Sequence, residues 1–141
     1  MTKSVLFACN MNSVRSPMAA ALLKLEAGDR IRVDSAGVYE GGLDPFVEIV
    51  MRDLDVAMND HEPKTLGEVD LADFDVVVAL TPEAAVEARK RLPRAAIEFW
   101  DTENPSEERG GRDAIIAAYA RVRDQLREKL ARRFPDIYKK P

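Results

Sequence analysis

The chain has 141 residues, of which 46% are hydrophobic and 33% are charged, and its formal net charge at pH 7 is −4. This composition predicts an ordinary soluble protein with residues 1–141 in a single domain, and the negative charge argues against nucleic-acid or membrane-surface binding. One cysteine excludes an internal disulfide and suits a reducing compartment. No apolar run has the length of a signal-peptide core or a membrane span, so we expect a cytoplasmic protein.

The first two predicted elements enclose a polar loop. Residues 5–8 are a short continuous apolar run, typical of a parallel strand buried on both faces. The run ends at Cys9, and a helix is predicted over 17–27, with Ser16 as its N-cap and Pro17 in its first position. A helix N-terminus offers unpaired N–H groups and a positive dipole, so the loop before it is expected to bind an anion.

The loop carries residue types that suit phosphoryl transfer. Arg15 supplies a planar set of donors that matches phosphate-like oxyanions, and this positive field favours the thiolate form of Cys9. Together they predict an enzyme that takes a phosphoryl group onto sulfur. A buried core residue is the alternative for a lone cysteine, but the polar residues that follow favour a site. The expected phosphate-binding residues are Asn10, Met11, Asn12, Ser13, Val14 and Arg15.

The pattern Cys9-x5-Arg15-Ser16-Pro17, placed between a strand and a helix, resembles the low-molecular-weight protein tyrosine phosphatases and the related thioredoxin-type arsenate reductases. The resemblance implies that Cys9 is the nucleophile and that Arg15 binds the oxyanion. It also implies that Asn12 holds the loop in shape, and that Ser16 stabilises the thiolate and helps it to leave.

Strand and helix patterns alternate along the rest of the chain, which predicts an α/β fold with a four-stranded parallel sheet and helices on both faces. The resemblance implies a flavodoxin-like strand order of 2-1-3-4, with the site beyond the carboxyl ends of the strands. In the last helix, Arg123 is expected on the solvated face. The expected elements are a strand at 31–33 with a turn at 34–37, a helix from Asp44-Pro45, a strand at 74–80, a helix from Thr81-Pro82, a strand at 96–100 and a helix at 113–133.

Two residues outside the loop receive roles from the resemblance. Tyr39 follows a turn that borders the substrate cleft in the family, so it is a candidate cleft wall, with a half-exposed loop tyrosine as the alternative. His61 begins a stretch in which the family has a histidine that supports the phosphate loop, with a surface histidine as the alternative. One histidine and one cysteine lack the spacing of metal ligands, so neither a metal nor another cofactor is expected.

The loop after the fourth predicted strand departs from the family. The family has an Asp-Pro pair there, and its aspartate is the general acid and base, whereas this chain has Asn104-Pro105. An amide cannot donate a proton to a leaving phenolate. Either Asp101 or Glu103 takes over the role, or the role is missing, and a solvated acidic loop is the alternative for each carboxylate.

The leading expectation is a hydrolase that acts on phosphotyrosine in a protein or on a small aryl phosphate, through a cysteinyl-phosphate on Cys9. Phosphate, arsenate and sulfate are expected to bind as free oxyanions. One alternative is an arsenate reductase that uses an external thiol, because one cysteine excludes the internal relay of the thioredoxin-linked type. The other is a weakly active oxyanion- or phosphopeptide-binding module, which Asn104, and Met11 in place of a common loop glycine, would favour.

Overall fold

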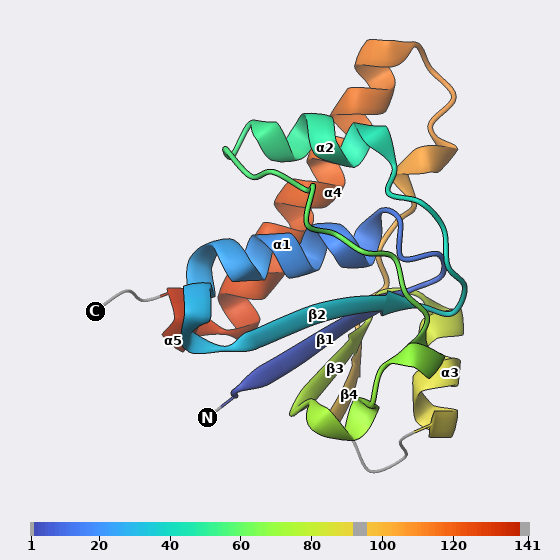
Figure 1. Cartoon of the computed structure of the whole chain (residues 1–141). Helices are drawn as coiled ribbons and strands as arrows, with labels where there is room; N and C mark the ends of the chain where they lie inside the picture. Colours follow the sequence, from blue (N-terminus) through green and yellow to red (C-terminus); the bar gives the residue numbers. More distant parts are fainter. Residues whose placement is uncertain (1, 92–95, 139–141) are drawn as a thin grey trace.

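A computed structural model describes residues 2–91 and 96–138 (Figure 1). Four parallel strands form one sheet in the order β2-β1-β3-β4, so the predicted α/β fold and its strand order are confirmed. The strands are β1 (Ser4–Cys9), β2 (Arg32–Gly37), β3 (Val76–Ala79) and β4 (Ala96–Phe99). The helices are α1 (Arg15–Ala27), α2 (Pro45–Arg52), α3 (Pro82–Arg91), α4 (Arg112–Arg133) and α5 (Pro135–Tyr138).

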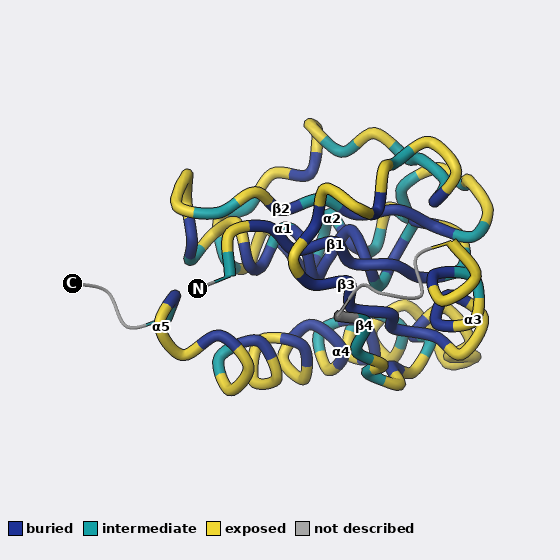
Figure 2. Tube along the Cα trace, turned by 90° about the horizontal axis from the view of Figure 1, so that it is seen from below, coloured by how far each residue is buried: buried dark blue, intermediate teal, exposed yellow. Residues whose placement is uncertain are grey.

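Helices cover both faces of the sheet. Figure 1 shows α1, α2, α4 and α5 on one face and α3 on the other. Buried residues are concentrated in the strands and on the helix sides that face them (Figure 2). All residues of β1 and β3 are buried, which explains why both strands read as continuous apolar runs instead of alternating patterns.

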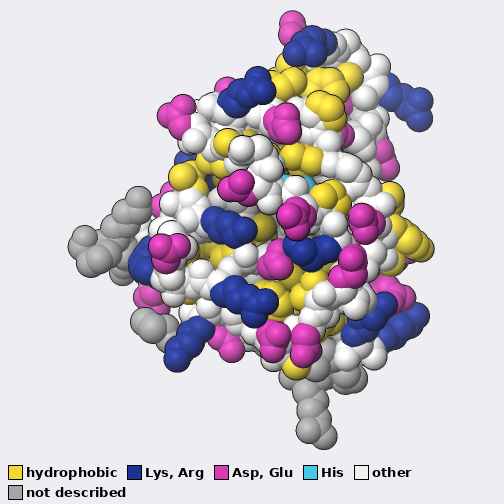
Figure 3. Space-filling view, in the orientation of Figure 1, with side chains coloured by type: hydrophobic (Ala, Val, Ile, Leu, Met, Phe, Trp, Pro, Cys, Tyr) yellow, Lys and Arg dark blue, Asp and Glu magenta, His cyan; other side chains and the backbone are white. Residues whose placement is uncertain are grey.

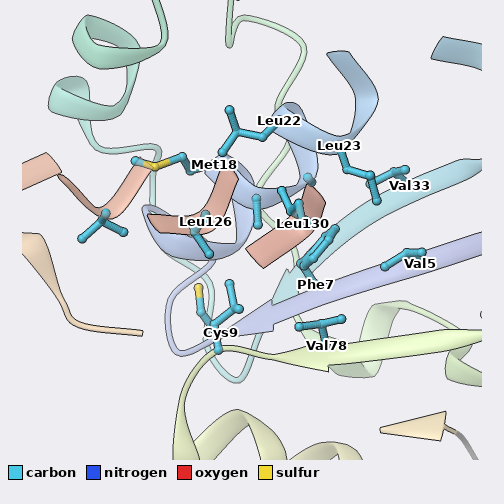
Figure 4. Close-up of a cluster of buried hydrophobic side chains, with 14 of the residues drawn as sticks. Val5, Phe7, Cys9, Met18, Leu22, Leu23, Val33, Val78, Leu126 and Leu130 are labelled. Carbon is cyan, nitrogen blue, oxygen red and sulfur yellow. The ribbon is translucent and has the colours of Figure 1, made fainter. Parts of the chain in front are cut away.

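The larger core cluster positions the end of β1. Because side chains alternate between the faces of a strand, Val5, Phe7 and Cys9 lie on the same face and belong to one cluster. Figure 4 shows Cys9 at one end of this row, with Met18 of α1 and Leu126 of α4 among the surrounding side chains. Burial of a side chain such as Phe7 contributes about 2–3 kcal/mol to folding. Cys9 is therefore held by a rigid, well-packed strand.

Two predicted boundaries at the carboxyl edge of the sheet are wrong. Helix α1 begins at Arg15, so Ser16 is not its N-cap but lies in the first turn, where its hydroxyl contacts Cys9. The expected turn at 34–37 is part of β2, because this segment continues the parallel pairing with β1 as far as the pair of Cys9 and Gly37. The second difference arises from pairing between segments that are distant in the sequence, and the first from a contact across the loop.

Two helix starts have the predicted caps. The side chain of Asp44 accepts a hydrogen bond from the N–H of Phe46 at 2.9 Å, and Thr81 Oγ1 accepts one from the N–H of Ala84 at 3.1 Å. Helix α5 had no sequence prediction. Within residues 2–91 and 96–138, no helix is both long and apolar enough to cross a membrane.

Arg123 does not lie on a solvated face as expected. Only 9% of it is exposed, and its Nη1 donates to the carbonyl of Val50 at 2.7 Å and to Asp53 at 2.9 Å. The carbonyl belongs to the last turn of α2, where main-chain oxygens lack helical partners, so the guanidinium caps that helix.

On the face drawn in Figure 3, basic and acidic side chains are interspersed.

Candidate active site

The loop between β1 and α1 has its carbonyl groups turned outward. Six consecutive carbonyl oxygens, from residue 9 to residue 14, take part in hydrogen bonds. Five of the six partners lie outside the loop and helix α1. In order, the partners are the N–H groups of Val38, Tyr39 and Gly41, the ring Nε2 of His61, and the N–H groups of Asp44 and Met18.

This arrangement directs the N–H groups of the loop inward. The C=O and N–H of a trans peptide point in opposite directions, so an outward carbonyl turns the next residue's N–H toward the interior of the loop. Within the described part of the chain, the N–H groups of residues 11–14 have no hydrogen-bond partner. A concave row of N–H groups ahead of a helix N-terminus is suited to binding an oxyanion.

Asn12 fixes the shape of the loop. Its φ of 53° lies in the left-handed region, which asparagine tolerates better than most residues, and it is fully buried. Its Nδ2 donates to the hydroxyls of Ser16 at 2.9 Å and Ser35 at 3.0 Å, and its Oδ1 accepts the N–H of Lys64 at 3.0 Å. The side chain thus connects the loop to α1, to β2 and to the segment after His61, which supports the predicted positioning role.

The thiol of Cys9 has a hydroxyl partner. Cys9 is 2% exposed, and its Sγ lies 2.9 Å from the Oγ of Ser16. The structure therefore brings the predicted nucleophile and the predicted serine into contact across seven residues of sequence. A hydroxyl at this distance can donate to a thiolate.

Arg15 extends from the first residue of α1 toward the loop that follows β4. Its Nη1 donates to the carbonyl of Thr102 at 3.1 Å, and its buried Nε has no hydrogen-bond partner within the described residues. An unpaired buried N–H costs about 1–3 kcal/mol, so such groups are rare unless they serve a ligand. A guanidinium that is held at one end and unpaired at Nε fits the predicted role of binding an oxyanion.

Gly37, the last residue of β2, lies directly beneath the loop. A Cβ at this position would be 2.7 Å from the N of Asn12 and 2.9 Å from the O of Asn10, and it would also clash with the carbonyl of Tyr39. No side chain fits there without displacement of the loop. The glycine that ends the stretch Asp-Ser-Ala-Gly at residues 34–37 is thus required by a close approach of two backbones.

His61 makes the contact that the resemblance implies. Its Nε2 lies 3.0 Å from the carbonyl oxygen of Asn12, so Nε2 carries the proton that is donated. Partial burial lowers the pKa of His61, and the positive charge of Lys64 acts in the same direction. The neutral ring is therefore the form that supports the loop.

Tyr39 lies beside the loop, and its role as a cleft wall stays a prediction. Its N–H donates to the carbonyl of Asn10 at 2.7 Å, and its hydroxyl donates to Glu83 at 3.0 Å. This bond and the negative charge of Glu83 raise the pKa of Tyr39. The side chain is 54% exposed, and Met11 of the loop is 43% exposed, so both present apolar surface beside the predicted phosphate-binding residues.

Neither of the two candidate acids, Asp101 and Glu103, hydrogen-bonds to Cys9, and Asn104 has no proton to give. Asn104 Oδ1 accepts from the N–H of Ser106 at 3.1 Å and from its hydroxyl at 2.7 Å, which caps the 3₁₀ turn Pro105–Glu107. Glu103 is paired with Arg121 at 2.9 Å. Asp101 is exposed and lines a groove beside β4 that also contains Phe99, Trp100, Lys129, Arg132 and Arg133. The identity of the general acid stays a prediction.

Three contacts of the site were not predicted from the sequence. Thr102 holds Arg15 through its carbonyl oxygen, and a main-chain contact leaves no signal in the sequence. Ser35 and Thr81 bind Asn12 and Asn10 through their hydroxyls, and for Ser35 the Asp-Ser-Ala-Gly stretch was the available signal. Among the described residues, no group of three or more His, Cys, Asp or Glu is placed to hold a metal ion.

The family model described as low molecular weight phosphotyrosine protein phosphatase matches residues 4–140. An arsenate reductase of Bacillus licheniformis is 30% identical over 130 residues, which cover 92% of this chain and 94% of that protein. The tyrosine phosphatase AmsI of Erwinia amylovora superposes with a TM-score of 0.76 at 23% identity, over 94% of this chain and 93% of its own. An arsenate reductase in its phosphate-binding state reaches a TM-score of 0.82 at 23% identity, over 96% and 98% of the two chains. The chain belongs to the low-molecular-weight phosphotyrosine protein phosphatase family.

Proposed function

We propose that this protein hydrolyses a phosphate monoester, either phosphotyrosine in a protein or a small aryl phosphate, through a cysteinyl-phosphate on Cys9. The observation that carries the proposal is the 2.9 Å contact between Cys9 Sγ and Ser16 Oγ, beside a loop whose N–H groups point inward. Membership of a family of phosphatases and arsenate reductases supports it. Because the single cysteine suits a reducing compartment, we place the reaction in the cytoplasm.

The first step is attack by sulfur on phosphorus. The thiolate of Cys9 forms the S–P bond while the bond from phosphorus to the phenolic oxygen breaks, and the phenolate leaves. The loop N–H groups and Arg15 hold the three equatorial oxygens, whose charge they stabilise in the transition state. In the second step water attacks phosphorus, phosphate is released, and the hydroxyl of Ser16 stabilises the departing thiolate.

Departure of the phenolate is the step that the structure supports least. The amide of Asn104 has no proton to give, and the carboxylate of Glu103 is engaged by Arg121. We therefore propose that the leaving group departs without strong general acid assistance, so that activated aryl esters react much faster than phosphotyrosine. The alternative is that Asp101 or Glu103 reaches the leaving oxygen once substrate is bound.

A second candidate is thiol-dependent reduction of arsenate, because the Bacillus licheniformis relative is an arsenate reductase. Arsenate has the tetrahedral shape of phosphate, and Cys9 would form a sulfur–arsenic adduct in the same loop. The chain has one cysteine, so the reducing electrons would come from a small external thiol. This reaction depends less on an acid at position 104.

Three assays on the same preparation separate the candidates: hydrolysis of nitrophenyl phosphate and of a phosphotyrosine peptide, and arsenite formation from arsenate with glutathione. We expect phosphate release, and a Cys9 peptide carrying one phosphoryl group after rapid acid quench. The Cys9→Ser variant should be inactive in all three assays. Arsenite formation without phosphate release would favour the reductase, and binding of phosphopeptide without turnover would favour the binding module.

A further inference from the structure

Two hydrogen-bonded connections join the loop at Asn10 to the start of α3. Tyr39 bonds to the loop through its N–H, which donates to the carbonyl of Asn10, and to α3 through its hydroxyl, which donates to Glu83. Thr81, two residues before Glu83, donates its hydroxyl to Asn10 Oδ1 at 2.7 Å. The carboxylate of Glu83 is therefore fixed relative to the residue that directly follows the nucleophile.

Glu83 carries an uncompensated negative charge. It is exposed in the first turn of α3, where the helix dipole stabilises a carboxylate, and within the described residues no lysine or arginine pairs with it. Glu87, one turn further along α3, is instead engaged by Lys90 and Arg91. Both glutamates raise the pKa of Tyr39, so the phenol stays protonated and continues to donate to Glu83.

The separation between Glu83 and the loop is similar to the length of a phosphotyrosine side chain. Tyr39 spans from the loop to Glu83, so the carboxylate stands about one tyrosine side chain away from the phosphate-binding backbone. A phosphotyrosine whose phosphate is bound in the loop extends over a similar length. Its own main chain and the side chains of its neighbours would then lie at the level of Glu83.

We propose that Glu83 makes the enzyme prefer protein segments that carry arginine or lysine next to the phosphorylated residue. The preference rests on the phosphatase activity proposed above. An acidic neighbour of the phosphotyrosine would meet the like charge of Glu83 beside the loop, whereas a basic neighbour would meet an opposite charge. Charges at exposed positions contribute modestly, so the expected preference in kcat/KM is about three- to tenfold at low salt.

The experiment compares two phosphotyrosine peptides that differ only in having arginine or glutamate on both sides of the phosphotyrosine. The parent enzyme should favour the basic peptide. Glu83→Gln should bring the ratio of kcat/KM for the two peptides close to one, and Glu83→Lys should invert it. Glu128→Gln makes the same change of charge on α4, away from the loop, and should leave the ratio as in the parent.

The preference for the basic peptide should also depend on the salt concentration. Raising the ionic strength shortens the screening length from about 10 Å near 0.1 M to about 3 Å near 1 M, so the preference should fall in the parent but not in Glu83→Gln. Equal kcat/KM for the two peptides in the parent, or an unchanged preference in Glu83→Gln and Glu83→Lys, would overturn the role of Glu83 while leaving the phosphatase intact. Failure to hydrolyse both peptides and nitrophenyl phosphate would overturn the proposed function and this inference with it.

Discussion

The sulfur of Cys9 and the hydroxyl oxygen of Ser16 lie 2.9 Å apart, which joins the last residue of β1 to the first turn of α1. Ser16 Oγ also accepts from Asn12 Nδ2 at 2.9 Å, and its own proton has a second possible acceptor, the carbonyl of Ala36, at 3.4 Å. Because the sulfur is closer, the hydroxyl is poised to donate to a thiolate. Once the sulfur carries a phosphoryl group, the same proton can turn to Ala36.

The first prediction concerns the reactivity of Cys9. Iodoacetamide should label this residue faster than it labels a free thiol near neutral pH, because the helix N-terminus, Arg15 and Ser16 favour the thiolate. Phosphate or arsenate should protect it, and Ser16→Ala should slow the reaction. Mass spectrometry of the single cysteine gives the rate. Labelling at the rate of a free thiol without protection by anions would contradict the thiolate assignment.

The second prediction concerns Arg15. Arg15→Lys keeps the positive charge but cannot form bidentate hydrogen bonds to an oxyanion. It also loses the hydrogen bond from Nη1 to the carbonyl of Thr102. Loss of a preorganised oxyanion donor typically lowers kcat by about 10²- to 10³-fold. Steady-state hydrolysis of nitrophenyl phosphate measures the change, and Arg132→Lys on the exposed side of α4 is the matched control. Parent-like turnover by Arg15→Lys would show that Arg15 does not bind the transferring group.

Local patterns predicted the parts of the site that lie within a short stretch of chain. The strand, the loop from Cys9 to Ser16 and the following helix could be predicted because periodicity and Pro17 act locally. Ser16 was misplaced as an N-cap because its hydroxyl is directed at Cys9, a contact made by folding of the loop. The burial of Arg123 depends on the approach of α4 to α2, which the pattern of one helix does not contain.

Contacts that use main-chain atoms were also beyond prediction. The carbonyl of Thr102 can hold Arg15 whatever its side chain is, so no residue type marks the contact. Gly37 ends the turn expected at 34–37, but the reason for the glycine is its approach to Asn10 and Asn12, which only the three-dimensional structure shows.

The third prediction concerns the stability that Asn12 provides. Asn12→Ala should lower the free energy of unfolding by about 2–4 kcal/mol, because the N–H of Lys64 loses its acceptor and alanine is strained at a φ of 53°. Asn12→Gly removes the same hydrogen bonds without backbone strain in the left-handed region, so it should be less destabilising than alanine. Urea unfolding of the three proteins measures both effects. Equal stability of parent and Asn12→Ala would contradict the positioning role.

The fourth prediction concerns pH. Burial lowers the pKa of His61 in the folded state, while in the unfolded chain it titrates near its usual value of about 6.5. Below about pH 6.5 the unfolded state therefore binds more protons than the folded state, and the free energy of unfolding falls as the pH decreases. The loss ends once His61 is protonated in the folded state as well.

His61→Gln keeps a donor for the carbonyl of Asn12 but does not titrate. Urea unfolding across this pH range should show a smaller decrease for His61→Gln than for the parent. The carboxylate of Asp34 and the amines of Lys64 and Lys24, which also act on His61, are unchanged in the comparison. Parallel pH profiles for the two proteins would show that His61 does not link the loop to pH.

The last prediction concerns the loop that follows β4. General acid catalysis contributes roughly 10²- to 10⁴-fold to such reactions. With the amide of Asn104 in place of an acid, hydrolysis of nitrophenyl phosphate should proceed, because nitrophenolate leaves without a proton, whereas phosphotyrosine should react slowly. Asn104→Asp should raise kcat/KM for phosphotyrosine well above its effect on nitrophenyl phosphate, since Pro105 follows Asn104 as proline follows the family's aspartate. An aspartate can also keep the cap on Ser106, so the turn should survive the substitution.

If Asp101 or Glu103 already serves as the acid, Asn104→Asp will change little, and Asp101→Asn or Glu103→Gln will abolish activity on phosphotyrosine alone. High and equal activity on both substrates, unaffected by all three substitutions, would show that the acid does not lie in this loop.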